Sequence, residues 1–324
     1  MKLNFEKNLK HQDKAVQSTI ALFESVPIIY PEDINQKYIN PKLDYVHYKY
    51  RSSSHRIKTE NGIQEKTDTS SKVIDIMMET GTGKTYTYTK TLFELNKLYG
   101  IFKFIIIVPT LSIKAGTISF LTSESARQHF REQYGKYIEL YVVESQNTKK
   151  NKKNCFPSSV SSFVSAGSYQ SDIIQVLVIN AGMLNSDTMV KRFDVQIFDK
   201  YNIPFEALSS VKPVVIIDEP HKFSQGNKSW ENIQKLKPQF ILRYGATFPE
   251  KEVIIKKIGN KREKIRVKDY HNLIYQLTAV DAFNQNLVKG VIGHVTEFKN
   301  GENTTARLVD TNGKECKMGT CFFQ

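Results

Sequence analysis

Apolar residues in this chain gather in short continuous runs and seldom alternate with polar ones. The runs occur within residues 73–78, 102–110, 138–145, 173–184, 214–217 and 238–248. Runs of this length are typical of parallel strands that helices cover on both faces. Helical patterns separate several of them, so the sequence predicts an α/β domain of three layers with a mostly parallel sheet.

The patterns before and around these runs define three segments. Residues 1–50 carry an amphipathic helical pattern within 11–26 and predict an N-terminal helical cap. Residues 51–71 are polar and nearly free of apolar positions, so we expect a flexible surface loop. Residues 72–250 contain the strands of the sheet and form the predicted core domain.

Two further segments follow the core. Residues 251–290 begin with strongly charged sequence and continue with a helical pattern from residue 275, which predicts a linking segment and a helix. Residues 291–324 alternate apolar and polar positions around Asn300-Gly301 and Asn312-Gly313, which are hairpin turn signals. We expect the start of a small antiparallel β-rich unit there.

A glycine-containing turn follows the strand predicted at 73–78. It reads Gly81-Thr82-Gly83-Lys84-Thr85 and leads directly into a helical pattern. The glycines let the backbone approach an anion, and the N–H groups of a helix N-terminus supply positive potential there. Lys84 is placed to reach the β- and γ-phosphates, and the Thr85 hydroxyl to hold Mg²⁺. The order predicts a phosphate-binding loop, although Met78 stands where the full pattern has glycine.

An acidic pair follows the strand predicted at 214–217. Asp218 is expected to hold Mg²⁺ through its water shell, and Glu219 to orient and polarise the attacking water. His221 is a candidate for coupling this site to a neighbouring lobe, although taken alone it is more typical of a surface residue. With Lys84, these three residues form the predicted catalytic group.

Gln12 stands at the start of the first predicted helix, ahead of the phosphate-binding loop. Its amide can donate to one adenine nitrogen and accept from another. An isolated glutamine is more typical of a surface or capping group, but the loop downstream favours the adenine role. The predicted cofactors are therefore ATP and Mg²⁺.

Two more polar groups follow predicted strands. Thr110, Ser112 and Lys114 come after the run at 102–110, where they are placed to bind phosphates of a polynucleotide. An ordinary strand-to-helix turn is the alternative. Gly245-Ala246-Thr247 ends the run at 238–248, and its threonine hydroxyl is a candidate for contacting the acidic motif and relaying the nucleotide state.

The charge of the chain favours a polyanionic partner. Its 46 Lys and Arg against 33 Asp and Glu give a formal charge of +13, which attracts nucleic acid. A well-solvated lysine-rich surface is the alternative. The 3 cysteines are too few and scattered for a disulfide framework or a zinc site. The sequence has no signal peptide pattern and no apolar run of about 18 residues, so we expect a cytoplasmic protein without membrane contact.

Taken in order, Gln12, METGTGKT, VPT, DEPH and GAT resemble the motifs of superfamily two helicase-type motors. Longer strings are similar to the restriction (Res) subunit of type III restriction-modification enzymes. They are METGTGKTYTYTKTLFELNKLYG, FIIIVPTLSIKAG, FPSSVSSFV, VIIDEPHKF and ILRYGATF. The resemblance covers most of residues 1–295 and implies a RecA-like P-loop NTPase lobe.

The resemblance also implies an activity and partners. In that family the Res subunit hydrolyses ATP as a DNA motor and carries a C-terminal nuclease domain, and a methyltransferase subunit recognises the DNA site. Matched motif by motif, Gln12 serves adenine, Lys84 and Thr85 the phosphates and Mg²⁺, and Asp218 and Glu219 hydrolysis. Residues 245–247 serve coupling. Duplex DNA and the methyltransferase are the implied partners.

Neither a second motor lobe with its arginine finger nor a nuclease core is recognisable in these residues. We therefore expect a Res subunit truncated after its first lobe, which binds ATP better than it hydrolyses it. Two alternatives remain at this point. One is a different superfamily two helicase, such as a repair helicase, and the other is a non-catalytic protein that binds nucleotide and a partner.

Overall fold

The computed structural model describes most of the chain in two compact units, Met1–Val288 and Lys289–Gln324. The described residues are 5–24, 26–32, 37–44, 48–144, 156–167, 171–258, 261–288, 305–311 and 316–321. The basic run at 146–155 lies outside them. In the second unit, β12 (Thr305–Thr311) pairs antiparallel with β13 (Cys316–Cys321).

A seven-stranded sheet forms the centre of the first unit. Its strand order is β11-β3-β8-β7-β4-β6-β5, and every neighbouring pair is parallel. The strands are β3 (Val73–Met78), β4 (Lys103–Val108), β5 (Tyr137–Val142), β6 (Ile173–Asn180), β7 (Val214–Asp218), β8 (Ile241–Gly245) and β11 (Asn272–Leu277). The side chains of β4, β7 and β8 are all buried, as the continuous apolar runs predict.

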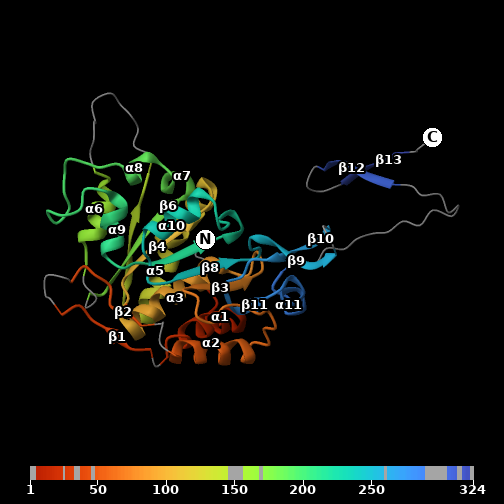
Figure 1. Ribbon diagram of the computed structural model, residues 1–324, viewed down its shortest axis with the longest axis horizontal. Coiled ribbons are helices and arrows are strands. Elements are labelled where there is room, and N and C mark those ends of the chain that lie inside the picture. The colour runs from red at the N-terminus through yellow and green to blue at the C-terminus, as the bar shows by residue number, and fades with distance from the viewer. Residues whose placement is uncertain are drawn as a thin grey trace. The chain divides into compact units, whose positions relative to one another are not determined.

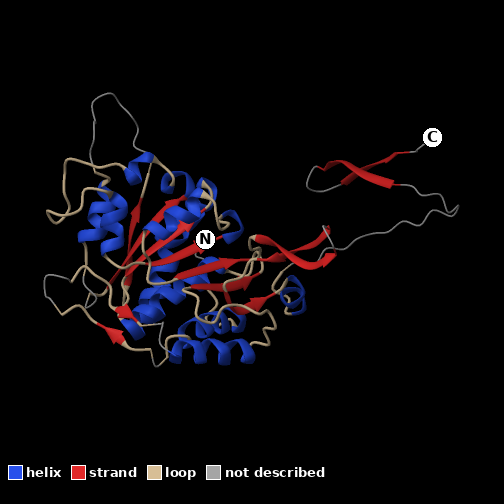
Figure 2. Ribbon diagram, viewed as in Figure 1, coloured by secondary structure: helices blue, strands red, loops and turns tan. Residues whose placement is uncertain are grey.

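Helices cover both faces of the sheet, which gives the predicted three layers (Figure 2). One core joins the sheet to α1 (Lys10–Ala21), α2 (Tyr48–Glu60), α3 (Lys84–Tyr99), α4 (Leu111–Thr122), α5 (Glu124–Tyr134) and α11 (Ala279–Asn284). The other joins it to α6 (Ser158–Ser165), α7 (Ala181–Leu184), α8 (Asp187–Val190), α9 (Pro204–Ser210) and α10 (Lys228–Lys235). Along β3, Ile74, Ile76 and Met78 belong to the first core, and Val73 belongs to the second.

The prediction of a flexible loop at 51–71 is wrong for its first half, because α2 spans Tyr48–Glu60. The helix buries only a few side chains, among them Tyr50 and Ile57, and packs beside β11. The Ser54 hydroxyl donates to Asn272 Oδ1 at 3.0 Å. So few apolar positions give no clear helical period, and contact with a late strand stabilises the helix instead.

The prediction of a linking segment and a helix at 251–290 is also wrong in part. β9 (Glu250–Ile258) and β10 (Lys261–Lys268) form an antiparallel hairpin, and β11 then joins the main sheet beside β3. Within the described residues of this segment, the helix is the short α11. The many charged residues of this segment conceal the hairpin in the sequence. Figure 1 shows it beside the β3 and β8 end of the sheet.

Two short elements complete the described chain. β1 (Ile28–Ile29) pairs antiparallel with β2 (Lys42–Leu43), and the 3₁₀ turn η2 (Pro220–Lys222) follows β7. The predicted hairpin around Asn312-Gly313 is flanked by the paired strands β12 and β13, although the turn itself lies outside the described residues, as does Asn300-Gly301. None of the helices in the described part of the chain is long and apolar enough to span a membrane.

Candidate nucleotide-binding and hydrolysis site

The loop between β3 and α3 has the backbone geometry that its glycines predict. Gly81 and Gly83 have φ values of +82° and +86°, a region that side chains disfavour. The Thr82 hydroxyl donates to the Glu79 carbonyl at 2.7 Å and closes the turn. α3 begins at Lys84, directly after Gly83, so the loop presents a helix N-terminus as an anion-binding site requires.

Gln12 lies against this loop. Its Nε2 donates to the Thr82 carbonyl at 3.1 Å, and a Cβ placed on Gly83 would lie 2.3 Å from the same nitrogen. His11, which the sequence gave no reason to select, also contacts the Thr82 carbonyl through Nε2 at 2.9 Å. Gln12 Oε1 is buried, and no residue in the described part of the chain forms a hydrogen bond with it. A buried acceptor of this kind is suited to an amino donor from a ligand.

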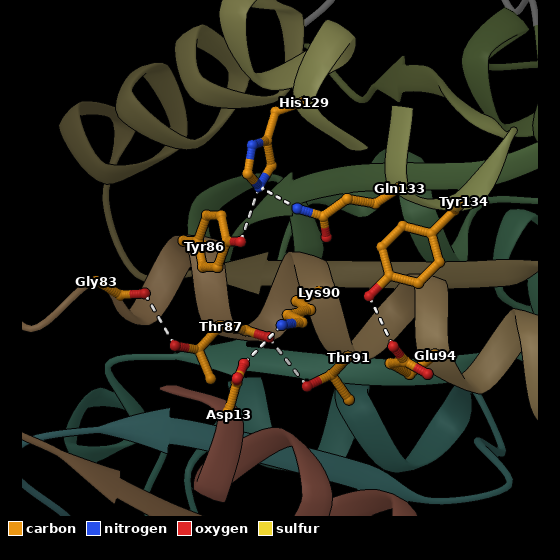
Figure 3. A network of polar contacts seen from close by, with 10 residues as sticks. All are labelled: Asp13, Gly83, Tyr86, Thr87, Lys90, Thr91, Glu94, His129, Gln133 and Tyr134. Atoms are coloured by element: carbon orange, nitrogen blue, oxygen red, sulfur yellow. Dashed lines mark hydrogen bonds and ion pairs between the residues drawn. The ribbon is translucent and has the colours of Figure 1, made fainter. Parts of the chain in front are cut away.

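A polar network ties the helix that carries Gln12 to the P-loop helix (Figure 3). Asp13 of α1 accepts from Lys90 of α3 at 2.6 Å. On the other side of α3, the Tyr86 hydroxyl and the Gln133 amide both contact His129 Nε2, at 2.8 and 2.9 Å. These contacts fix α1 and α5 against α3, so the position of Gln12 depends on the P-loop helix.

The acidic pair, Asp218 and Glu219, lies opposite the phosphate-binding loop at the carboxyl ends of the strands. Lys84 Nζ lies 3.3 Å from Glu219 Oε1, although β8 separates their strands. Glu219 has a φ of +55°, which is unusual for a residue with a side chain and typical of functional sites. Burial, reinforced by the negative charge of Glu219, raises the pKa of Asp218 to about 6. Asp218 Oδ1 is buried and has no hydrogen-bond partner among the described residues.

The predicted coupling residues meet the acidic motif. His221 Nδ1 lies 2.9 Å from Thr247 Oγ1 and 3.4 Å from Glu219 Oε2, so one ring connects β7 with β8. Gly245 packs on η2, where an added Cβ would lie 2.4 Å from Pro220 Cδ. The structure therefore gives a geometric reason for the glycine as well as for the threonine.

The structure separates the three residues predicted to contact nucleic acid. Ser112 is exposed, and Thr110 is an exposed cap of α4 whose hydroxyl accepts from the Ile113 N–H at 3.3 Å. Lys114 is only 6% exposed, and its amine donates to the Val143 carbonyl. The prediction that Lys114 binds a DNA phosphate is wrong for this reason, since a long apolar stem can place an amine inside the protein.

The residues present fit a nucleotide with Mg²⁺. In the described part of the chain, no group of three or more His, Cys, Asp and Glu side chains is arranged as a metal site. A magnesium ion bound with a nucleotide needs fewer protein ligands, because phosphates and water supply the rest. Thr85 at the start of α3 and the unpaired Asp218 Oδ1 would hold it, and it would neutralise charge on the phosphates.

The parallel sheet has helices on both faces, a phosphate-binding loop, an acidic pair and a threonine in contact with the acidic motif. This combination defines a helicase-like P-loop ATPase lobe. A family model described as "Type III restriction enzyme, res subunit" matches residues 7–250. The chain belongs to this family, and its first unit is a RecA-like α/β domain.

Two relatives share nearly half of their matched residues with this chain. The EcoPI Res subunit of Escherichia phage P1 is 47% identical over 89% of the chain, and the EcoP15I Res subunit of Escherichia coli is 46% identical over 88%. The chain spans 28% of the length of each. Among solved structures, the type ISP restriction-modification enzyme LlaGI, in complex with a DNA substrate mimic, matches 74% of this chain and 20% of its own. The sequence identity there is 15% and the TM-score 0.38.

Proposed function

We propose that this chain is the ATP-binding motor lobe of the DNA-translocating and DNA-cleaving subunit of a type III restriction enzyme. The observation that carries the proposal is the continuous line of contacts from Lys84 through Glu219 and His221 to Thr247. It connects the loop that would hold the phosphates with the strand end that would relay the nucleotide state. Its partners would be duplex DNA and the methyltransferase subunit, in the cytoplasm.

Each residue of the site has a defined task in this proposal. Gln12 Oε1 would accept from the adenine amino group, while its Nε2 remains on Thr82. Lys84 would leave Glu219 for the β- and γ-phosphates, and the Glu219 carboxylate would then be free to orient the attacking water. Thr85 and Asp218 would hold Mg²⁺, which supplies Lewis-acid stabilisation of the phosphate charge.

We further propose that the isolated chain binds ATP more readily than it hydrolyses it. In P-loop NTPases an arginine directed at the γ-phosphate is worth roughly 10³ to 10⁵ in rate. No candidate for such an arginine emerged from the sequence motifs. A downstream lobe or another polypeptide would have to supply it.

The test is ATP binding and turnover by this chain, with and without duplex DNA, beside Lys84→Ala. We expect binding that requires Mg²⁺ and is lost in the variant, and slow turnover that DNA does not change. Nucleotide binding that survives Lys84→Ala would refute the assigned site. Rapid DNA-stimulated turnover that depends on Lys84 would refute only the proposal of poor hydrolysis.

A further inference from the structure

The β9–β10 hairpin carries a large share of the net charge of the chain. Residues 250–268 contain eight Lys and Arg against three Glu, a formal charge of +5 within a total of +13. The two strands pair with each other and with no third strand of the described chain. Two-stranded ribbons are marginally stable alone in water, so a hairpin of this kind needs another source of order.

The hairpin leaves the sheet beside the candidate nucleotide site. Glu250, its first residue, follows Thr247 by only three positions, after β8 has ended at the edge where the phosphate-binding loop lies. The Asp269 N–H donates to the Pro249 carbonyl at 2.7 Å and closes the base of the hairpin. An ion pair of 2.8 Å between Lys251 and Asp269 reinforces this closure.

A buried arginine fastens that base to two strands of the sheet. Arg243 of β8 donates through Nε and Nη2 to both oxygens of Asp75 in β3, at 2.6 and 2.8 Å. Its Nη2 also donates to the Asp269 carbonyl at 3.0 Å, and its guanidinium lies 5.4 Å from the Phe248 ring centre. The hairpin base is thereby bound to β3, which ends before the phosphate-binding loop, and to β8, which ends two residues before Thr247.

The exposed side chains of the hairpin match a duplex polyanion. Lys264 and Lys268 are about half exposed, and each pairs with an exposed glutamate, at 2.9 and 2.6 Å. Such surface pairs contribute little and exchange readily for phosphate. A two-stranded ribbon has the width that the major groove of duplex DNA admits.

We propose that the β9–β10 hairpin is a duplex-DNA contact of this lobe, held in position by the Arg243–Asp75 pair. The inference rests on the proposed function for the choice of DNA as the polyanion. Contacts of this kind go to backbone phosphates, so they contribute affinity and position without sequence specificity.

The test compares duplex-DNA binding by four forms of the 324-residue chain, using a fluorescent duplex and anisotropy between 50 and 200 mM salt. Lys264→Gln/Arg266→Gln removes two hairpin charges, and Lys97→Gln/Arg131→Gln removes the same two charge types from exposed sites at the ends of α3 and α5. We expect the hairpin variant to bind at least about tenfold more weakly near 0.1 M salt, with the salt slope reduced by about two. The control should bind as the unmodified chain does.

A hairpin variant that binds duplex DNA more tightly cannot owe its change in affinity to misfolding. Glu250→Gln/Glu252→Gln frees Lys268 and Lys264 from their partners, so this variant should bind the duplex more tightly than the unmodified chain does. Equal binding by the two hairpin variants and the control would overturn the hairpin proposal and leave the nucleotide site untouched. Failure of the unmodified chain to bind duplex DNA at 50 mM salt, while it still binds ATP, would overturn the hairpin proposal together with the DNA partner.

Discussion

Two ion pairs of the first unit differ in how completely their atoms are satisfied by hydrogen bonds. Asp75 and Arg243 are almost entirely buried, with side chains 0% and 1% exposed, and they share two short hydrogen bonds. Lys84 and Glu219 are more accessible, at 10% and 21%, and meet in one contact of 3.3 Å. Both pairs join segments that are far apart in the sequence, but among the described residues only the second lies beside buried acceptors without a hydrogen-bond partner.

The difference distinguishes a structural pair from a binding site. A buried pair is tolerated when every donor and acceptor is used, because desolvation of the charges must be offset. Asp75 meets this condition, since its Oδ2 also accepts from the His271 N–H at 2.6 Å. Around Lys84, Asp218 Oδ1 and Gln12 Oε1 have no partner. A ligand with phosphates, a bound metal ion and an amino group would supply partners for these two acceptors and for the Lys84 amine.

Arg243→Met should break the structural pair and give the largest effect on stability. It leaves the Asp75 carboxylate buried without its cation, which typically costs about 3–5 kcal/mol of unfolding free energy. Denaturant unfolding measures this loss. Lys84→Ala should change stability by less than about 1 kcal/mol in the same experiment, since its pair is accessible and longer.

The double variant Arg243→Met/Asp75→Leu tests whether the loss of stability comes from the unpaired Asp75 carboxylate. Replacing both charges with apolar groups removes the desolvation cost together with the pair, so much of the lost stability should return. If the double variant is as unstable as Arg243→Met, the arginine contributes mainly through Asp269 and Phe248, and the comparison of the two pairs fails.

Gly245→Ala should have an intermediate effect. The new Cβ would lie 2.4 Å from Pro220 Cδ and force β8 and η2 apart, and overpacking of this kind costs about 1–3 kcal/mol. Thermal or denaturant unfolding measures it. Gly116→Ala is a matched control, because nothing lies within 4 Å of its added Cβ and alanine favours the helix. If Gly245→Ala and Gly116→Ala are equally stable, β8 and η2 can move apart at little cost in free energy.

Gln12→Ala should have the smallest effect and the most selective one. Loss of one amide acceptor should weaken ATP binding by about tenfold, the value of a hydrogen bond near 1.4 kcal/mol, and leave GTP binding unchanged. Calorimetry with both nucleotides measures this. Lys14→Ala, at an exposed position of the same helix, should change neither. An equal loss for ATP and GTP would mean that Gln12 supports the loop and does not read the base.

The sequence predicts the centre of the fold well and its edges poorly. The apolar runs of β3, β4, β6, β7 and β8 identify strands because burial on both faces requires them. α2 and β11 depend on each other across the chain, so neither has a sufficient local signal. The hairpin at 250–268 gives no clear strand signal because charged residues interrupt its apolar positions.

The candidate site shows the same division. Lys84, Asp218 and Glu219 stand in motifs whose spacing already specifies a shared location, and the structure brings them together. Arg243 and Asp75 carry no motif, and their pairing follows from the strand order β3-β8, which the sequence does not reveal. Lys114 was misplaced because a lysine next to a strand end carries no sign of whether its amine turns outward.

The position of β3 between β8 and β11 has a consequence for the synthesis of the protein. Both neighbours of the strand that carries the phosphate-binding loop are made long after it, since β8 begins at Ile241 and β11 at Asn272. At roughly 5–20 residues per second, β11 leaves the ribosome on the order of ten to forty seconds after β3. Until β8 emerges the nascent strand has an open edge on each side, and one edge remains open until β11 follows, so β3 can pair with other strands during its synthesis.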